Sequence, residues 1–425
     1  MNYDLAMNFD MELLNYIEKN DIKHQVTSMF GKLKEDIIGG GRSSVTLPEV
    51  TKEELQTIVN KCNQLGIKFN YLMNPLCIAN KDLISDSHRE ILMFIDELRE
   101  MGIPAITVNS PYLCEVIKRH YPDMWVTLGL YAMVNGIQQI NNWITLGADE
   151  ITLPHSMNRD FEMLEHVLKA FKDTHVKFRL IANNACLHDC PFAIHHASGV
   201  SHSSAKDGKG NDKYIDYNII NCYFRKVTKP THLICSDWIR PEDVHYYDEL
   251  CDRAGNHNLI IKLVERSKGT EFLSEVLQAY LDEKYEGNLR KLFNWADTGN
   301  VVNKNIDNKA FLEEILSGKM DAKSINQYIK FFTQLPNVIV DNQKLDGFIN
   351  HFLGRYPCRE KPCWTENVDP PKGQTKYCTY CYQWMQKAVS YPEDVNLEKW
   401  SENGNKLFEN MRSSRIFGVK ESIHE

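Results

Sequence analysis

Cysteine is the residue type most able to do chemistry in this chain, because eight of its 12 cysteines fall into two groups. The C-terminal group has the spacing Cys358-x4-Cys363-x14-Cys378-x2-Cys381. Two close pairs separated by a loop with proline and glycine are typical of a small metal-stabilised module. We therefore expect residues 357–381 to bind zinc or a 4Fe–4S cluster, with metal binding coupled to local folding.

The second group lies in the middle of the chain. Cys186 and Cys190 flank a His-Asp pair in NNACLHDCPF, Cys222 lies in NCYFRKV, and Cys235 lies in LICSDW. Polar neighbours and a following proline indicate a loop, where ligation explains thiols better than burial. Four thiolates would suit a 4Fe–4S cluster, and zinc would also accept them. The radical S-adenosylmethionine spacing C-x3-C-x2-C is absent, because PFA follows Cys190. The remaining cysteines fit a buried core: Cys62, Cys77, Cys114 and Cys251.

The composition excludes several classes of protein. The chain has 49 Lys and Arg against 57 Asp and Glu, and a formal charge of −8 argues against a broad nucleic-acid-binding face. A hydrophobic share of 43% with 25% charged residues excludes wholesale disorder. No run approaches the roughly 20 apolar residues of a membrane span, and the first residues lack a secretory signal. We expect a cytoplasmic protein whose cysteines are not in disulfides.

Short apolar runs alternate with helical patterns over residues 24–266, and these elements must position the cysteines. The runs are Gln25–Phe30, Ile67–Asn74, Ala105–Asn109, Trp125–Tyr131, Glu150–Pro154, Val176–Asn183, His232–Cys235 and Leu259–Arg266. Near-continuous apolarity suits parallel strands covered on both faces. The alternation predicts an α/β fold, a (β/α)8 TIM-like barrel, with an open doubly wound sheet as the alternative. One intervening helix has a capping box at Thr51 and Glu54 and one apolar stripe.

The predicted barrel gathers the candidate residues. Loops that follow barrel strands meet at one face, so Cys186, Cys190, Cys222 and Cys235 could converge there. We place the barrel and its iron–sulfur site in residues 1–290. A helical extension with the four-cysteine module occupies residues 291–425.

Further candidates lie near the predicted mouth of the barrel. His188 and His195, close to the first cysteine pair, could move protons. Lys262 and Arg266 could hold a carboxylated small molecule, although an ion pair with Glu265 is the competing explanation. Four residues at strand ends are candidate substrate ligands, although an asparagine there can instead cap a helix: Asn74, Asn109, His155 and Asn183.

Five segments resemble one known family over roughly residues 20–285. They are GIKFNYLMNP, LGADEITLP, KFRLIANNACLHDC, ICSDWIRPED and IIKLVER. They resemble the collagenase-like peptidase family of unassigned catalytic type, which includes the oxygen-independent ubiquinone-biosynthesis and tRNA and rRNA hydroxylation proteins. The resemblance implies a barrel with a 4Fe–4S cluster held by Cys186, Cys190, Cys222 and Cys235. It also implies hydroxylation without O2, with prephenate thought to supply the oxygen.

In the same resemblance, Lys262 and Arg266 align with basic positions of the family. The family's glutamate in this strand aligns with Val264, whereas this chain has Glu265 one place later. One residue along a strand points to the opposite face, so the glutamate's role is not carried over.

The leading hypothesis is therefore an iron–sulfur enzyme. It would catalyse an oxygen-independent hydroxylation or related redox modification of a small molecule or a biopolymer group. One alternative is a peptidase, although the sequence has neither His-Glu-x-x-His nor Gly-x-Ser-x-Gly. Another is a non-catalytic iron–sulfur electron-transfer subunit that works with a second protein. We expect no membrane partner.

Overall fold

The computed structural model describes residues 1–204, 217–293, 322–370, 372–373, 376–413 and 415. Eight parallel strands form a closed barrel in chain order, with β8 hydrogen-bonded back to β1. The strands are β1 (Asn2–Ala6), β2 (Val26–Gly31), β3 (Lys68–Met73), β4 (Ala105–Val108), β5 (Trp125–Leu128), β6 (Glu150–Thr152), β7 (Lys177–Ile181) and β8 (Leu259–Leu263). The predicted (β/α)8 barrel is confirmed.

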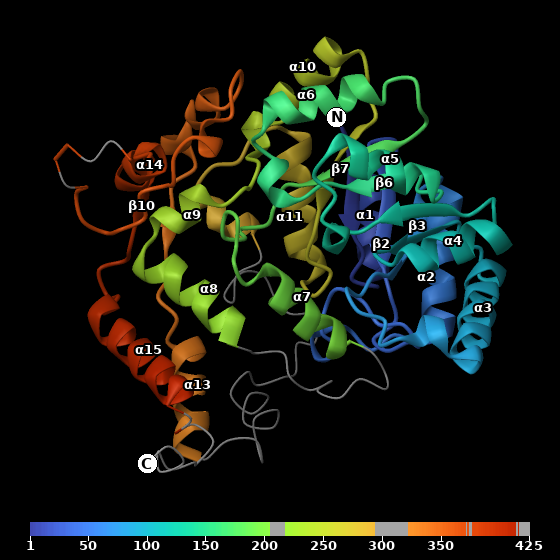
Figure 1. Ribbon diagram of the computed structural model, residues 1–425, viewed down its shortest axis with the longest axis horizontal. Coiled ribbons are helices and arrows are strands. Elements are labelled where there is room, and N and C mark those ends of the chain that lie inside the picture. The colour runs from blue at the N-terminus through green and yellow to red at the C-terminus, as the bar shows by residue number, and fades with distance from the viewer. Residues whose placement is uncertain (205–216, 294–321, 371, 374–375, 414, 416–425) are drawn as a thin grey trace.

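Helices cover the outside of the barrel (Figure 1). They are α1 (Met11–Lys19), α2 (Lys52–Leu65), α3 (Ser85–Glu100), α4 (Pro111–His120), α5 (Ile137–Thr145), α6 (Phe161–Ala170), α10 (His245–Ala254) and α11 (Thr270–Leu281). Helix α2 shows how local sequence sets these elements. The Thr51 side chain accepts from the N–H of Glu54, whose carboxylate accepts from the N–H of Thr51. The predicted apolar stripe is the buried face of α2.

Two strand assignments from the sequence were wrong. The run His232–Cys235 belongs to a short helix, α9 (Thr231–Cys235), and the true first strand, Asn2–Ala6, was not predicted. A buried run of four apolar residues fits a strand or a helix turn equally well, so periodicity alone could not decide. Strand β1 looked polar because Asp4 lies inside the barrel, 2.9 Å from Arg179.

The barrel interior contains a buried polar network. Asp4, Asn70, Thr127 and Arg179 come from the alternate strands β1, β3, β5 and β7, and each is at most 1% exposed. The amide of Asn70 donates to the hydroxyl of Thr127 at 2.9 Å. Alternate strands supply each layer of a TIM barrel, and here the layer is polar rather than aliphatic.

A long connection follows β7 and carries three helices. They are α7 (Ala193–His202), α8 (Tyr217–Thr228) and α9. The extension contributes α13 (Ala322–Thr333), α14 (Tyr380–Ala388) and α15 (Leu397–Arg412), with a small sheet of β9 (Ile339–Val340) and β10 (Val389–Ser390). Helix α14 packs on α9 and α15 packs on α8, so the extension lies beside this connection (Figure 1).

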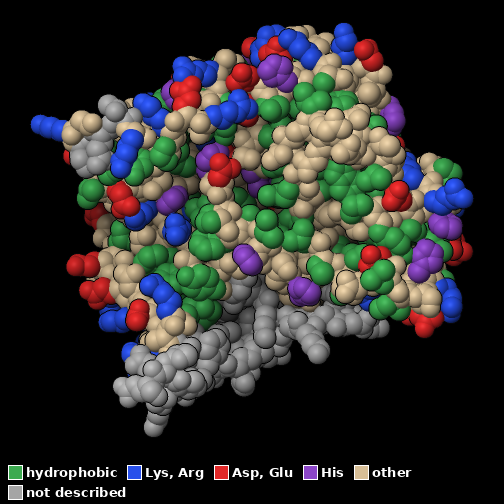
Figure 2. Space-filling model, viewed as in Figure 1, with side chains coloured by type: hydrophobic (Ala, Val, Ile, Leu, Met, Phe, Trp, Pro, Cys, Tyr) green, Lys and Arg blue, Asp and Glu red, His purple; other side chains and the backbone are tan. Residues whose placement is uncertain are grey.

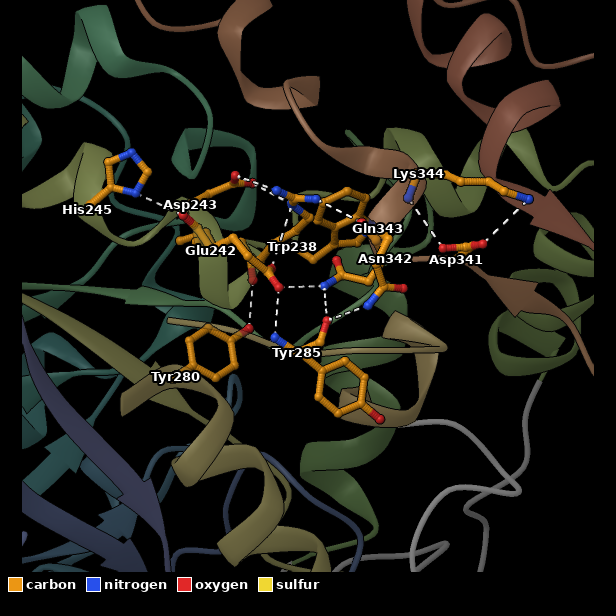
Figure 3. Close-up of polar contacts among 12 residues, drawn as sticks. Trp238, Glu242, Asp243, His245, Tyr280, Tyr285, Asp341, Asn342, Gln343 and Lys344 are labelled. Carbon is orange, nitrogen blue, oxygen red and sulfur yellow. Dashed lines mark hydrogen bonds and ion pairs between the residues drawn. The ribbon is translucent and has the colours of Figure 1, made fainter. Parts of the chain in front are cut away.

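The extension shares its apolar core with the barrel. A single cluster of buried side chains runs from barrel residues to Phe348, Cys381 and Leu407 of the extension. A polar contact reinforces it: Figure 3 shows Asn342 between Glu242 and Tyr285. The predicted boundary near residue 290 stays a prediction, and residues 294–321 lie outside the described part of the chain.

The surface shows no single-sign field on the face drawn in Figure 2, where acidic and basic side chains are interspersed around the rim. Across the described residues, no helix combines the length and apolarity needed to cross a bilayer.

Candidate functional site

A glycine-rich loop after β2 carries Arg42 to the mouth of the barrel, where the carboxyl ends of the strands meet. The N–H of Gly41 donates to Oδ1 of Asn74 at 3.2 Å. The hydroxyl of Tyr131 donates to the carbonyl of Gly41 at the same distance. Asn74 therefore lies at the mouth as predicted, but its side-chain oxygen holds the loop in place.

Arg42 forms an ion pair with Glu265, and Arg266 lies beside them. Glu265 is 1% exposed and adopts a left-handed φ of 106°, a conformation that costs free energy in a residue other than glycine. Burial, together with the nearby charge of Arg42, lowers the pKa of Arg266 to about 9. Nε of Arg266 and Oε2 of Glu265 are buried without a hydrogen-bond partner. Two guanidinium groups thus lie close to one carboxylate, and Nε of Arg266 is left to donate to an anion.

The sequence analysis grouped Arg266 with Lys262, whereas the structure places Arg266 beside Arg42 at the mouth of the barrel. Lys262 lies on β8 inside the barrel, with Nζ 4.0 Å from the centre of the Phe30 ring. Burial, together with the charge of Arg179, lowers its pKa well below the usual value. Glu265 follows the end of β8, so strand alternation does not set its direction. Sequence reasoning missed Arg42, although three consecutive glycines followed by a cation in the loop after a strand are a signal for it.

The predicted strand-end asparagines brace the loops of the mouth. Asn109 donates to the Asn74 carbonyl at 2.5 Å, and its Oδ1 is buried without a partner. Asn183 donates to the carbonyls of Val264 and Leu292 and accepts from the N–H of Val264. These contacts make Asn183 a structural residue, whereas Asn109 keeps one acceptor available.

The predicted histidines differ in their surroundings. His155 lies 3.2 Å from the amide of Asn184 through Nε2, and its Nδ1 is buried without a partner. Burial lowers the pKa of His155 to about 4, so the ring is neutral near pH 7. Because the Asn184 amide group donates to Nε2, the proton of the neutral ring lies on Nδ1. His195 is exposed on α7 and is the weaker candidate.

His188 forms a buried pair with Asp237. Its Nδ1 lies 2.9 Å from Oδ1 of Asp237, which is 3% exposed. Burial alone lowers the pKa of His188, but the hydrogen bond and charge of Asp237 outweigh it and raise the pKa to about 9. The ring is therefore a cation near neutral pH.

The structure divides the cysteines differently from the sequence-based grouping. Cys190 is influenced by the thiols of Cys222 and Cys186, so these three lie near one another. Cys235 instead hydrogen-bonds to Cys363 and Cys381 of the extension. The reason is packing: α14 lies on α9, which brings the last residue of α9 to the first turn of α14.

One small cavity collects the regrouped thiols. It is lined by Arg159, His188, Cys235, Asp237, Phe352, Tyr356, Cys358, Cys363 and Cys381. Cys378 does not line it, although its backbone bridges to Cys363. Within the described ranges, no group of three or more His, Cys, Asp or Glu side chains already has the arrangement of a metal site. Metal ligation by either group stays a prediction. Of the other cysteines, Cys62, Cys114 and Cys251 are buried as expected, but Cys77 is exposed.

Part of the barrel is similar to a known family. Residues 40–177 match the model of peptidase family U32. The chain is 28% identical over 257 residues to an uncharacterized protease of Methanocaldococcus jannaschii, a match that covers 60% of this chain and 72% of that protein. It is also 24% identical over 132 residues to the tRNA hydroxylation protein P of Escherichia coli, covering 30% of this chain and 27% of that protein.

Among solved structures, that of a U32 peptidase aligns over 62% of this chain and 93% of its own, with 18% identity and a TM-score of 0.45. The U32 match covers β3 to β6 completely and begins in the loop that carries Arg42. The long connection with Cys186, Cys190 and Cys222 and the extension lie outside the matched residues. The activity of this chain therefore has to be argued from its own side chains.

Proposed function

We propose that this protein is an iron–sulfur enzyme that performs an oxygen-independent hydroxylation or related redox modification. The observation that carries the proposal is the environment of Tyr131. Burial raises the pKa of this tyrosine, and Arg42, Cys186 and Arg266 are the charged or ionisable groups that influence it. Two guanidinium groups and a thiol of the predicted metal-binding set thus lie near one side chain at the barrel mouth.

The donor set fits an iron–sulfur centre. Cys186, Cys190 and Cys222 are soft thiol ligands, and thiolates select iron–sulfur clusters and zinc over hard metals. Such a centre would carry electrons from the group that is hydroxylated, and so oxidised, to a carboxylated co-substrate at the mouth that gives up the oxygen and is reduced. The relationship to a tRNA hydroxylation protein supports this reading over hydrolysis.

The residues of the chain would bind and orient the substrate. Arg266 and Arg42 would bind a carboxylate through parallel hydrogen bonds, with the carboxylate taking part of the contact that Glu265 now makes. His155 would donate a hydrogen bond to the substrate from its unpartnered Nδ1. The hydroxyl of Ser201 on α7 accepts from the N–H of Leu76, which fixes α7 against the loop that follows β3.

The test compares anaerobically grown cells that lack the protein with cells that express the wild type or Arg266→Met. Nucleosides and small molecules are analysed by mass spectrometry, and iron and sulfide are measured in the purified protein. We expect a product one oxygen heavier than its precursor that requires the wild type, and protein that contains iron and sulfide. Cluster-free protein that forms the same product would refute the proposal.

A peptidase remains the second candidate, because the family name and the archaeal relative favour it. This alternative predicts cleavage of a peptide library by metal-free protein. The iron–sulfur proposal predicts no cleavage under those conditions.

A further inference from the structure

The cavity between α9 and α14 contains thiols from both parts of the chain. Cys235 ends α9, Cys381 lies in the first turn of α14, and Cys358 and Cys363 come from the loop before it. Cys235 hydrogen-bonds to Cys363 and Cys381, and Cys358 hydrogen-bonds to Cys363. All four side chains therefore lie within reach of one another although they span more than a third of the chain.

Cys378 has a different position from the other cysteines of the C-terminal group. Its N–H donates to the carbonyl of Pro362 at 2.8 Å, and its carbonyl accepts from the N–H of Trp364 at 2.8 Å. These bonds hold the two segments around Cys363 together through the backbone. The Cys378 side chain does not line the cavity.

A buried cation lines the same cavity. Arg159 is 2% exposed and donates to the carbonyls of Ile234 and Trp238. In the part of the chain that the structure describes, no ion pair joins Arg159 to a carboxylate. Asp243 influences it from a distance, but both oxygens of Asp243 are bound by Arg240. Carbonyl oxygens and aromatic faces, such as those of Trp238 and Phe348, offset its charge only in part, so negative charge in this cavity would stabilise Arg159.

Thiolates bound to a metal would supply that charge. Four thiolates around Zn²⁺, or around a cluster core of the same charge, leave an excess of about two negative charges. Metal binding requires the thiols to lose the protons that now form hydrogen bonds between them. It also requires the thiols to turn toward the shared cavity. A guanidinium at the wall of the cavity favours this ionised state.

We propose that Cys235, Cys358, Cys363 and Cys381 form a tetrathiolate metal centre that fastens the extension to the barrel, with Arg159 as its buried counter-charge. Four protein ligands leave no open position, so this centre is closed to substrate. Neighbouring contacts support the fastening role: Arg359, next to Cys358, forms ion pairs with Asp160 and Glu162 of the barrel. The centre does not depend on the reaction proposed above.

The test uses the full chain, purified without oxygen, as wild type, Cys235→Ser, Cys358→Ser, the double variant and Cys378→Ser. Zinc, iron and sulfide are counted per chain. We expect both single variants to lose the same metal, the double variant to lose no more than either single variant, and Cys378→Ser to retain the wild-type content. If the single variants lose zinc relative to the wild type, the site binds zinc. If they lose iron with sulfide, the site holds a cluster, and either result supports the centre.

The opposite pattern would overturn the proposal. If Cys235 binds metal with Cys186, Cys190 and Cys222 instead, the double variant loses the sum of the two single losses. If Cys378 is the fourth ligand, Cys378→Ser loses metal like Cys358→Ser. Wild-type protein without zinc and without iron–sulfide also refutes it. Circular dichroism checks that each variant is folded, and Cys235→Ala replaces Cys235→Ser if a buried hydroxyl prevents folding.

Discussion

At the scale of single residues, Arg42, Glu265 and Arg266 decide what the mouth of the barrel can bind. Glu265 and Arg266 are buried with one unpartnered polar atom each, and an anion that accepts from Nε of Arg266 would relieve the cost of burying that donor. The left-handed φ of Glu265 keeps its carboxylate against Arg42. The site therefore combines strain and unpaired polar atoms, a combination that is common where a protein binds a ligand.

Replacing Arg266 tests this view. Arg266→Met should weaken binding of a small dicarboxylate by at least about tenfold, because it removes a charge-assisted hydrogen-bond donor worth about 1.5–3 kcal/mol. The free energy of unfolding of Arg266→Met should equal or exceed that of the wild type, since the variant no longer buries a cation near Arg42. Calorimetric titration and urea unfolding measure the two effects. Arg119→Met, a change in a cation at the C-terminal end of α4, is the control. Unchanged binding in Arg266→Met would contradict the assignment.

His155 should make the fold sensitive to acid. Its pKa in the folded state is lowered to about 4, whereas an unfolded histidine titrates near 6.5. Below about pH 6.5 the histidine is protonated in the unfolded chain but stays neutral in the folded chain. The free energy of unfolding therefore decreases as the pH is lowered to about 4. The loss at pH 5 should be about 2 kcal/mol.

Urea unfolding at pH 7 and pH 5 measures this loss. His155→Gln should lose about 2 kcal/mol less stability between these values than the wild type. His257→Gln changes an exposed histidine and should follow the wild type. An equal pH dependence in wild type and His155→Gln would show that other groups cause it.

At the scale of elements, the loop after β2 positions Arg42, and its glycines fit closely against the barrel. Gly40 is bound to the Ser204 hydroxyl through its N–H at 2.7 Å and its carbonyl at 2.9 Å. A Cβ on Gly40 would lie 2.8 Å from Cδ of Lys32, which is buried in an ion pair with Asp36. The loop can follow this path only without a side chain at that position.

Gly40→Ala should therefore displace the loop and weaken dicarboxylate binding by about tenfold, roughly 1.4 kcal/mol. The eight strands should remain folded, because the change lies beyond the end of β2. Gly136→Ala is a matched control, since an added Cβ there meets nothing within 4 Å. Titration calorimetry of both variants decides, and equal affinities would mean that the loop does not position the anion site.

At the scale of the whole molecule, the extension and the barrel share one apolar core, and the proposed thiolate centre lies where they meet. Removing metal with a chelator should loosen this junction while the barrel keeps its own buried strands. We expect one thermal transition in the metal-bound protein and two after chelation, the lower one belonging to the extension. Tryptophan fluorescence follows it, because Trp364, Trp384 and Trp400 lie in the extension.

Cys235→Ser without chelator should give the same two transitions, whereas Cys378→Ser should unfold in one. Restoring zinc, or iron and sulfide, should merge the transitions in the wild type and leave Cys235→Ser unchanged. A single transition in chelated wild type would show that the apolar contacts alone join the two parts.

The sequence by itself determined the features that depend on near neighbours along the chain. The capping box at Thr51, the buried stripe of α2 and the alternation of strands and helices need interactions within a few residues, and they predicted a barrel correctly. The tertiary structure alone decided which distant side chains meet. Cys235 joins cysteines more than 100 residues away because α14 packs on α9, and Arg42 reaches Arg266 because a glycine loop crosses the mouth. Such partners are set by packing between elements, which leaves no period or spacing in the sequence.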